Sequence, residues 1–395
     1  MVSSLGLYIT AILACYTPLF SLAIPLNRVR DTRTYIVKLK SGVIPGSHIS
    51  SSSFSQYNEH IFDSRVLNGY AIGLTPSAME VLKVKYAEQI EYVEEDQVVR
   101  VTSVVVQKDA TWGLQRITQE ETLPQSSNST ALNYTYSYDS SAGEGVDIYI
   151  FDTGVYIEHE EFGGRATHAP VFAPDRSEPG DKFGHGTHCA GTAAGIRYGV
   201  AKKANIIDVK VLGDEGYGTT SGIIAGLSWA VANANSTNRP GVINMSLGSF
   251  GSSTSAQSDA VRQTIASGLT VVVAAGNAQV SATDWTPANV DEAIVVGNLN
   301  ITGGQFWTSN YGPTLDVFAP GTDVVSAGIA GPNATQADTG TSMAAPHVAG
   351  IAAYLLSLEG PRTPAELSAR IVGLSVPGVF NGLSPNTTNL VAQLM

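Results

Sequence analysis

The stretch Gly340-Thr341-Ser342-Met343-Ala344-Ala345-Pro346-His347-Val348-Ala349-Gly350 places a serine at the start of a run of small and apolar residues. Gly340 and Thr341 can form a turn into a helix, and proline is tolerated near a helix start, so the pattern predicts a buried helix that begins at Ser342. The positive end of the helix macrodipole would stabilise negative charge beside this hydroxyl. Ser342 is therefore a candidate nucleophile, which needs a base, an orienting acid and an oxyanion donor elsewhere in the chain.

The overall composition is that of a globular protein. The chain has 395 residues, 43% of them hydrophobic, and no low-complexity tract, so it can form one large domain and a small one. Residues 24–104 carry nine basic and nine acidic side chains, so the formal net charge of −12 comes from residues 105–395. An acidic surface repels phosphate groups, which argues against a nucleic acid or an anionic membrane as partner.

The first residues have the pattern of a secretory signal. Leu5–Phe20 is an uncharged apolar run that is too short and too early for a spanning helix, and Ser21-Leu22-Ala23 offers the small residues that a signal peptidase reads. We expect cleavage after Ala23 and secretion to the extracellular space in preference to a vacuole. Cys15 leaves with the signal, so Cys189 remains alone and the mature chain has no intramolecular disulfide.

An exported chain can carry N-linked glycans, and this sequence has seven Asn-x-Ser/Thr sequons. Chance alone gives several of them in a chain rich in serine and threonine. Asn244 follows the apolar pair Val242-Ile243, which predicts a buried strand where no glycan can be attached. The sequons begin at Asn128, Asn133, Asn235, Asn244, Asn300, Asn333 and Asn386.

Residues 31 to about 104 have the pattern of a small independent α+β unit. Its apolar and alternating runs predict strands and helices in turn. The tail, Val98–Val106, is an extended segment suited to lying in a peptide-binding groove. The predicted strands are Thr34–Leu39, Gly69–Leu74 and Ile90–Glu94, and the predicted helices are Ser51–Phe62 and Pro76–Tyr86.

After Trp112–Ile117 and a polar loop to about Gly145, apolar strands alternate with helices. The strands are continuous apolar runs, which is typical of a parallel sheet covered on both faces. The alternation predicts a doubly wound α/β sheet with its functional site at the carboxyl ends of the strands. The predicted strands are Val146–Phe151, Ile206–Leu212, Val242–Met245, Thr270–Ala275, Ala293–Gly297 and Asp316–Phe318, and the helices begin at His185, Thr219, Ala256, Ser342 and, with a capping box, Thr363.

Three polar residues stand at the ends of these apolar elements. Asp152 directly follows a strand, and taken alone it indicates no more than a carboxylate that caps a turn. His185 lies between two glycines that leave its imidazole accessible; a metal site shared with His188 would lack a Glu or a third His at suitable spacing. Asn277 ends an apolar strand that has no structural need for an amide, and it suits an oxyanion donor.

Together with Ser342, these motifs resemble those of the subtilisin-like serine proteases, most closely the fungal proteinase K group. The resemblance covers nearly the whole chain after the signal. The N-terminal unit, with its Tyr35-Ile36-Val37-Lys38 opening and Glu91–Asp96 close, is similar to the inhibitor-type prosegment of that family. The resemblance implies a signal peptide at residues 1–23, an autoprocessed inhibitor and chaperone propeptide at 24–104, and a subtilisin-like catalytic domain at 105–395.

The same resemblance assigns roles to the four residues. Asp152 orients and stabilises His185, which is the general base and then the acid. Ser342 attacks the scissile carbonyl to form an acyl-enzyme, and Asn277 with the Ser342 backbone N–H binds the oxyanion. The order Asp, His, Ser is the order of subtilisin itself, so it identifies the family without being an independent deduction.

The resemblance also implies how substrate binds. The substrate backbone would add as a strand between Gly216–Gly218 and Ser246–Gly248. The first specificity pocket would be lined by Ala274–Gly276, with no charged residue. This implies broad cleavage after apolar and aromatic residues. We expect a monomer that acts on protein and peptide substrates and is inhibited by its own propeptide. The implied contact residues are Gly216, Tyr217, Gly218, Ser246, Leu247, Gly248, Ala274, Ala275 and Gly276.

Two positions depart from the family pattern. Ala345 stands where serine or threonine is usual, and Ser249-Phe250 replaces a second glycine, which would narrow the substrate groove. No cofactor is implied for catalysis. A structural calcium ion is implied at the Asp316 carboxylate with the carbonyls of Asp291 and Ala293.

Two other classes of function are open. Asp152-Thr153-Gly154 and Asp338-Thr339-Gly340 are two copies of the tripeptide that pepsin-like aspartic proteases use as a catalytic pair. That fold is almost entirely β, however, and it would leave His185 and Asn277 without roles. A secreted glycoprotein with a silent protease fold is the other alternative, although all four catalytic positions are intact. A serine-directed phosphonylating reagent and an aspartic-protease inhibitor would separate the three classes.

Overall fold

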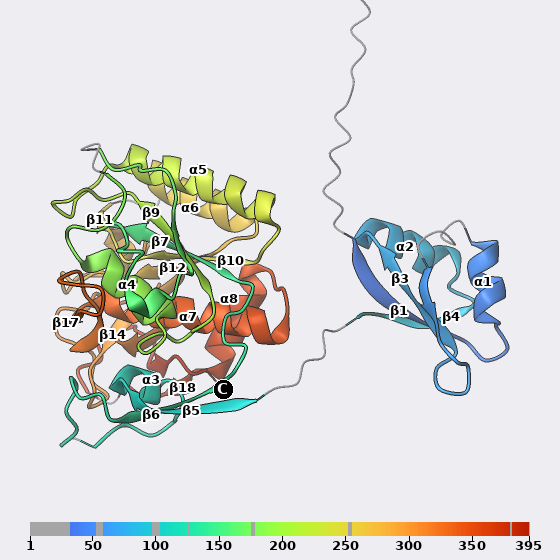
Figure 1. Ribbon diagram of the computed structural model, residues 1–395, viewed down its shortest axis with the longest axis horizontal. Coiled ribbons are helices and arrows are strands. Elements are labelled where there is room, and N and C mark those ends of the chain that lie inside the picture. The colour runs from blue at the N-terminus through green and yellow to red at the C-terminus, as the bar shows by residue number, and fades with distance from the viewer. Residues whose placement is uncertain are drawn as a thin grey trace, which may run out of the picture. The chain divides into compact units, whose positions relative to one another are not determined.

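The computed structural model describes residues 32–52, 58–96, 103–124, 126–174, 178–251, 255–379 and 381–394. The chain forms two compact units, Met1–Val98 and Val99–Met395 (Figure 1). The signal predicted at residues 1–23 lies outside the described residues.

The first unit is a four-stranded antiparallel sheet with two helices. The strand order is β2-β3-β1-β4. Side chains from the sheet and from both helices, such as Val37, Ile49 and Leu82, share one core. The predicted α+β pattern is therefore confirmed. The elements are β1 (Arg33–Leu39), α1 (Pro45–Ser51), β2 (Asn58–Ile61), β3 (Gly69–Leu74), α2 (Pro76–Lys85) and β4 (Ile90–Glu95).

The helix predicted at Ser51–Phe62 is wrong. Residues 58–61 form β2, and Ile61 pairs with Tyr70 of β3. Residues 53–57 lie outside the described residues. Asn58, His60 and Ile61 are modest helix formers, so β2 has little local preference to oppose pairing with a strand that lies further along the chain. The other predicted helix of this unit is confirmed as α2.

The second unit is built on a nine-stranded sheet. Its order is β18-β19-β15-β14-β12-β10-β7-β9-β8, and every neighbouring pair is parallel except β18 and β19. The doubly wound, mostly parallel α/β fold is therefore confirmed, which rules out the all-β pepsin-like alternative. The strands are β7 (Asp147–Asp152), β8 (Ala166–His168), β9 (Asn205–Lys210), β10 (Gly241–Met245), β12 (Thr270–Ala274), β14 (Ile294–Leu299), β15 (Val317–Pro320), β18 (Val376–Pro377) and β19 (Leu390–Val391).

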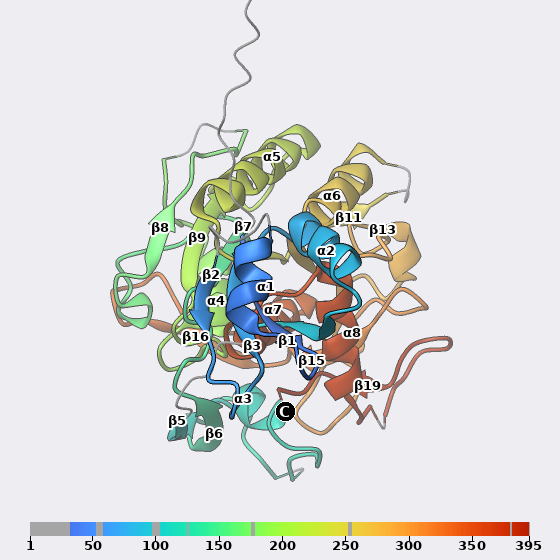
Figure 2. The same ribbon diagram turned by 90° about the vertical axis from the view of Figure 1, so that its right-hand side faces the viewer.

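Helices cover both faces of this sheet. One core lies between the sheet and α4, α7 and α8, and the other lies between the sheet and α5 and α6, which run side by side (Figures 1 and 2). Within β7, Ile148 faces the first core and Tyr149 the second, which explains why the strands have no polar face. The helices are α3 (Trp112–Arg116), α4 (His185–Ala194), α5 (Thr220–Thr237), α6 (Ala256–Ala266), α7 (Thr341–Glu359) and α8 (Pro364–Leu374). The capping box predicted at Thr363 is present at the start of α8.

Several short strands were not predicted, because ribbons of two to seven residues leave little periodicity in a sequence. The region expected to be a loop up to Gly145 contains β6 (Tyr134–Asp139), which pairs with β5 (Val104–Ala110). The end of the predicted extended tail thus belongs to β5. Two further ribbons pair β11 (Ser249–Phe250) with β13 (Trp285–Thr286) and β16 (Val324–Ala327) with β17 (Thr335–Asp338).

The helix that begins beside Ser342 is the central core helix of the second unit. Among the described residues, α7 alone is long and apolar enough to cross a membrane, but 89% of its most apolar window is buried inside the protein. Its apolar length is thus explained by packing between the sheet and α4.

The sequons differ in exposure. Asn244 is fully buried in β10, as predicted, and its Nδ2 donates to Ser246 Oγ at 3.0 Å, so it cannot carry a glycan. The exposed sequons are Asn128, Asn133, Asn235, Asn333 and Asn386, whereas Asn300 is half-buried.

Candidate active site

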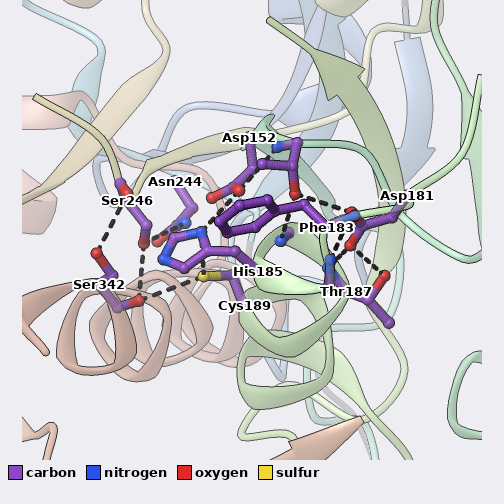
Figure 3. Close-up of polar contacts among 12 residues, drawn as sticks. Asp152, Asp181, Phe183, His185, Thr187, Cys189, Asn244, Ser246 and Ser342 are labelled. Carbon is purple, nitrogen blue, oxygen red and sulfur yellow. Dashed lines mark hydrogen bonds and ion pairs between the residues drawn. The ribbon is translucent and has the colours of Figure 1, made fainter. Parts of the chain in front are cut away.

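Several predicted site residues lie close together at the carboxyl edge of the parallel sheet; Figure 3 shows Asp152, His185, Ser246 and Ser342. Asp152 is the last residue of β7, Ser246 follows β10 directly, and Asn277 follows the turn after β12. These three strands are neighbours in the sheet, so their ends meet. His185 opens α4 and Ser342 lies in the first turn of α7, and both helices pack on the same face.

Asp152 holds His185 through one short hydrogen bond. His185 Nδ1 lies 2.7 Å from Asp152 Oδ1, which also accepts the Thr153 backbone N–H at 2.8 Å. The Asp152 carboxylate is fully buried, and its Oδ2 has no hydrogen-bond partner among the described residues. Because Nδ1 donates to the carboxylate, Nε2 of the neutral ring is left as a proton acceptor.

The two neighbouring histidines have opposite electrostatics. Burial acts to lower the pKa of His185, but the carboxylate of Asp152 outweighs it, and the pKa is raised well above its usual value. Burial lowers the pKa of His188 to about 4, and its Nε2 lies 2.8 Å from the Val324 carbonyl. His188 is therefore a neutral structural residue, with Nε2 bonded to the Val324 carbonyl.

Sequence analysis missed Asp181, which orders the segment leading into α4. Its Oδ1 accepts the Thr153 hydroxyl at 2.9 Å and the Gly184 N–H at 2.8 Å, and its Oδ2 accepts the Thr187 hydroxyl at 2.7 Å. Asp181 thus caps the first turn of α4, because the N-cap residue Gly184, with φ of +100°, has no side chain to do so. The sequence signal that could have identified it is a carboxylate four residues before His185, just ahead of the predicted helix.

The first turn of α7 is completed from outside the helix. The Ser342 carbonyl would normally accept the N–H of residue 346, which is proline and has none. It accepts instead from Ser246 Oγ at 2.8 Å and from Cys189 Sγ at 3.3 Å. The Ser342 hydroxyl donates to the Ser246 carbonyl at 3.2 Å. Pro346 is therefore tolerated because two neighbouring side chains replace the missing donor.

Cys189 lies against the imidazole of His185. Its Sγ is 4.0 Å from His185 Nδ1, and burial raises the pKa of this free thiol. Among the described residues, Asp152, His185 and Cys189 each offer one possible metal-ligand atom, and these three atoms lie within 4.8 Å of one another. Asp152 and His185 are hydrogen-bonded to each other, however, so the atoms that a metal ion would need are already paired.

Thr341 decides which way the Asn277 amide points. Asn277 Oδ1 accepts the Thr341 N–H at 2.8 Å and the Thr341 hydroxyl at 3.1 Å. Since a backbone N–H requires an acceptor, the oxygen of the amide must face Thr341. The Nδ2 donor is thereby left on the other side of the amide, and Asn277 lines the same groove as Ser342.

His185, Asn277 and Ser342 line one groove of about 440 Å³, and Asp152 is not among its lining residues. None of its lining residues is Asp, Glu, Lys or Arg, in line with the expected uncharged pocket. Ala275 does not line it; this residue is buried in the core on the α5 and α6 side of the sheet. Every other predicted contact residue does, namely Gly216, Tyr217, Gly218, Ser246, Leu247, Gly248, Ala274 and Gly276. Lining residues not predicted include Phe183, Leu212, Ile223 and Trp285.

Comparison with known proteins assigns this fold to a family of peptidases. The sequence model of a protein family, Peptidase S8, which is described as the subtilase family, matches residues 143–384. The chain belongs to the subtilase family. It is a subtilisin-like serine protease, a peptide hydrolase of a class that needs no cofactor for catalysis.

Similar proteins are fungal proteases. Subtilisin-like protease 2 of Pseudogymnoascus destructans is 44% identical over 77% of this chain and 72% of its own length. Subtilisin-like protease 1 of the same organism is 38% identical over 97% of this chain and 96% of its own. The cuticle-degrading serine protease of Arthrobotrys oligospora is 40% identical over 84% of this chain and 78% of its own.

The fold is also that of a solved relative. The crystal structure of a cold adapted subtilisin-like serine proteinase matches with a TM-score of 0.64 and 39% sequence identity. The match covers 73% of this chain and 99% of that one. The aspartic-protease and silent-glycoprotein alternatives find no support in these relatives.

Proposed function

We propose that Asp152, His185 and Ser342 are the catalytic triad of this endopeptidase. The observation that carries the assignment is the 2.7 Å hydrogen bond from His185 Nδ1 to buried Asp152, beside a groove that Ser342 also lines. Among the described contacts the Ser342 hydroxyl is bonded to Ser246 and not to His185. Hydrogen bonds between a nucleophile and its general base are often long or absent without substrate and tighten only when substrate is bound.

The proposed reaction follows the residues in order. Ser342 Oγ attacks the scissile carbonyl carbon while His185 Nε2 takes its proton, and the buried charge of Asp152 stabilises the imidazolium that results. Collapse of the tetrahedral intermediate breaks the C–N bond, and His185 returns the proton to the leaving amine. Water then attacks the acyl-enzyme while His185 Nε2 takes its proton, and this step releases the second product and restores Ser342.

Asn277 is proposed to bind the oxyanion together with the Ser342 backbone N–H, which has no partner within the helix because it lies in the first turn. Asn277→Ala should fold normally and lose about 10²- to 10³-fold in kcat with little change in KM, the loss measured for this donor in subtilisin, a member of the same family. Steady-state kinetics on a peptide amide would check it. An unchanged kcat would exclude Asn277 from the oxyanion site.

Substrate is proposed to lie along the groove as an added strand, between Gly216–Gly218 and Ser246–Gly248. Both segments line the groove, and its uncharged character supports cleavage after apolar and aromatic residues. The natural substrates would be proteins outside the cell, which the predicted secretion signal and the relative named for degrading cuticle both support. We propose a monomer for the mature enzyme.

The first unit is proposed to be a propeptide that assists folding and inhibits the enzyme until self-cleavage near residues 103–105. Its separate core supports an independent folding unit. The second unit rests on non-local parallel strand pairing, which is slow to form, so a prefolded partner would help it. After the cut, the new N-terminus would remain in place, because β5 pairs with β6 from Val104 onward.

A structural calcium ion is proposed at Asp316. Its Oδ2 accepts the Val295 N–H at 2.8 Å, while burial, aided by nearby Asp291, raises the pKa of the carboxyl to about 6. A half-buried carboxylate that has no cationic partner among the described residues fits the hard oxygen ligands that Ca²⁺ prefers, and the Asp291 and Ala293 carbonyls would complete the set.

Removal of calcium tests this site. Chelation of Ca²⁺ with EGTA should lower the Tm of the wild-type protein, whereas Asp316→Asn should have a low Tm that neither EGTA nor added Ca²⁺ changes. Differential scanning fluorimetry at pH 7.5 measures both. A wild-type Tm that is insensitive to calcium would remove Asp316 as a ligand.

A further inference from the structure

A buried lysine lies beside the proposed triad and has no part in the reaction described above. Lys210 ends β9 and pairs with Asp152 in the sheet, and its side chain is only 1% exposed. Its Nζ donates to the Thr153 carbonyl and, at 3.0 Å, to Asp214 Oδ1. Since the Thr153 N–H donates to Asp152 Oδ1, Lys210 holds the other end of the residue that bonds the carboxylate.

Asp214 joins this lysine to the segment in front of His185. Its Oδ1 accepts from Lys210, and its Oδ2 accepts from Lys182 Nζ at 2.9 Å. The hydrogen bonds from Lys182 and then from Lys210 lower the pKa of Asp214, so the carboxylate stays charged at neutral pH. Because Lys182 lies three residues before His185, one carboxylate connects the end of β9 with the start of α4.

The same carboxylate belongs to a tight loop that forms one side of the groove. The Gly216 N–H donates to the Gly213 carbonyl at 2.9 Å, and the Gly213 N–H donates to the Tyr217 carbonyl at 2.9 Å. Residues 216–218 line the groove and are proposed to pair with the substrate backbone. Asp214, which contacts both lysines, is thus two residues away from the substrate-binding segment.

A second contact links this loop to the segment before His185. A Cβ built on Gly216 would lie 2.8 Å from Phe183 Cε2, so the phenyl ring lies against the loop backbone. Phe183 follows Lys182 directly, and the ring and the ion pair therefore bridge the same two segments. A peptide that pairs with the loop would bind to a segment that is tied at two points to the residues before His185.

The two ion pairs of Asp214 differ in strength. Lys210 is buried, and a buried ammonium that loses its carboxylate partner is strongly destabilised. The Lys182 side chain is 64% exposed, so solvent screens its ion pair, which contributes little. Asp214 is therefore held chiefly to the turn at Thr153, and the contact with Lys182 adds a weaker restraint.

We propose that Asp214 is a positioning residue that couples the substrate-binding loop to the triad. When a peptide orders the loop, Asp214 and Lys210 fix the turn at Thr153 and, with it, the Asp152 carboxylate. Binding at a distance from the scissile bond is thereby used to raise kcat, and not only to lower KM. The inference rests on the proposed function, because it adds a residue to the same reaction.

The test compares two p-nitroanilides, acetyl-Phe and acetyl-Ala-Ala-Ala-Phe, of which only the longer can pair with residues 216–218. In the wild type, kcat for the long substrate divided by kcat for the short one should be well above one. In Asp214→Asn this ratio should fall by at least about 10-fold, because a small displacement of a catalytic group is costly. A side chain that served only the stability of the fold would leave the ratio unchanged, whatever its effect on Tm.

Two further variants define the effect. Lys182→Met removes only the exposed ion pair and should lower the ratio by about 2-fold. Asp259→Asn is the matched control, since Asp259 pairs with Arg262 at 3.0 Å on α6 and does not line the groove; its ratio should equal that of the wild type. Active sites are counted in each variant with a fluorophosphonate, and Tm is measured alongside.

A wild-type ratio near one, or an unchanged ratio in Asp214→Asn, would overturn the inference, as would an equal fall in Asp259→Asn. Should Asp214→Asn fail to fold, Lys182→Met decides in its place, and a wild-type ratio there would equally overturn it. Failure of the proposed function looks different: the wild-type enzyme would cleave neither substrate or would not react with the fluorophosphonate.

Discussion

Replacement of Ser342 with alanine is expected to abolish peptide hydrolysis, with a loss of about 10⁶-fold in kcat, the size measured for this change in subtilisin, a member of the same family. Without Oγ no acyl-enzyme can form, and the oxyanion donors can only polarise the substrate for attack by water. The alanine variant should keep its fold, because the contacts that hold the first turn of α7 are made by the Ser342 carbonyl and not by its side chain.

Hydrolysis of casein and of a peptide amide would measure the loss. Ser228→Ala is the matched control, since Ser228 is an exposed serine on α5, away from the groove. Near-full activity in Ser342→Ala, with the control also active, would rule out the proposed nucleophile.

The same variant tests self-processing. If the enzyme cuts its own propeptide, Ser342→Ala expressed alone should accumulate as one uncut chain that begins near Ile24, while the wild type yields an N-terminus near residues 103–105. N-terminal sequencing of both products distinguishes them. Normal cleavage of the variant in a host without related proteases would mean that another protease matures the enzyme.

Asp152→Asn is expected to cost about 10⁴-fold in kcat, the order measured for the equivalent carboxylate in subtilisin and in chymotrypsin-like proteases. Asparagine can still accept from His185 Nδ1 and from the Thr153 N–H with its oxygen, so the ring can stay in place. Its amide carries no charge, however, and the imidazolium formed during attack would be buried without a counter-ion.

The pH profile separates this electrostatic effect from a loss of structure. His185 must be neutral to act as a base, and the Asp152 carboxylate raises its pKa. The wild-type kcat/KM should therefore rise with pH through a transition above 6.5, and the transition in Asp152→Asn should move to lower pH while the plateau falls. Measurement of kcat/KM from about pH 5 to pH 10 shows both changes. A transition that stays in place would mean that Asp152 does not set the basicity of His185.

Sequence patterns were sufficient where the signal is local. Apolar strands buried on both faces read as continuous runs, and Asp152 and Asn277 were conspicuous because each polar residue closes such a run. The capping box at Thr363 and the small-residue helix after Ser342 are likewise determined by residues that are close together in the sequence. These features indicated the class of fold and drew attention to single polar residues, whereas the roles predicted for Asp152, His185, Asn277 and Ser342 came from the resemblance to the subtilisin-like family.

Contacts between residues far apart in the chain were decided only in the folded molecule. Residues 58–61 became a strand because β3 was available to pair with them, against the helix expected there. Asn277 points its donor away from Thr341 because a backbone N–H from α7 claims its oxygen, and Pro346 is accommodated because Ser246 and Cys189 reach the carbonyl it cannot serve. Trp285 lies beside Gly248 and Gly276 in the groove because β11 pairs with β13. Local propensity and apolar patterning act through neighbouring residues, so they can specify helices and strands and the polar residues that end them. The orientation of the Asn277 amide and the replacement of the donor missing at Pro346 depend on residues that meet only when the chain is folded.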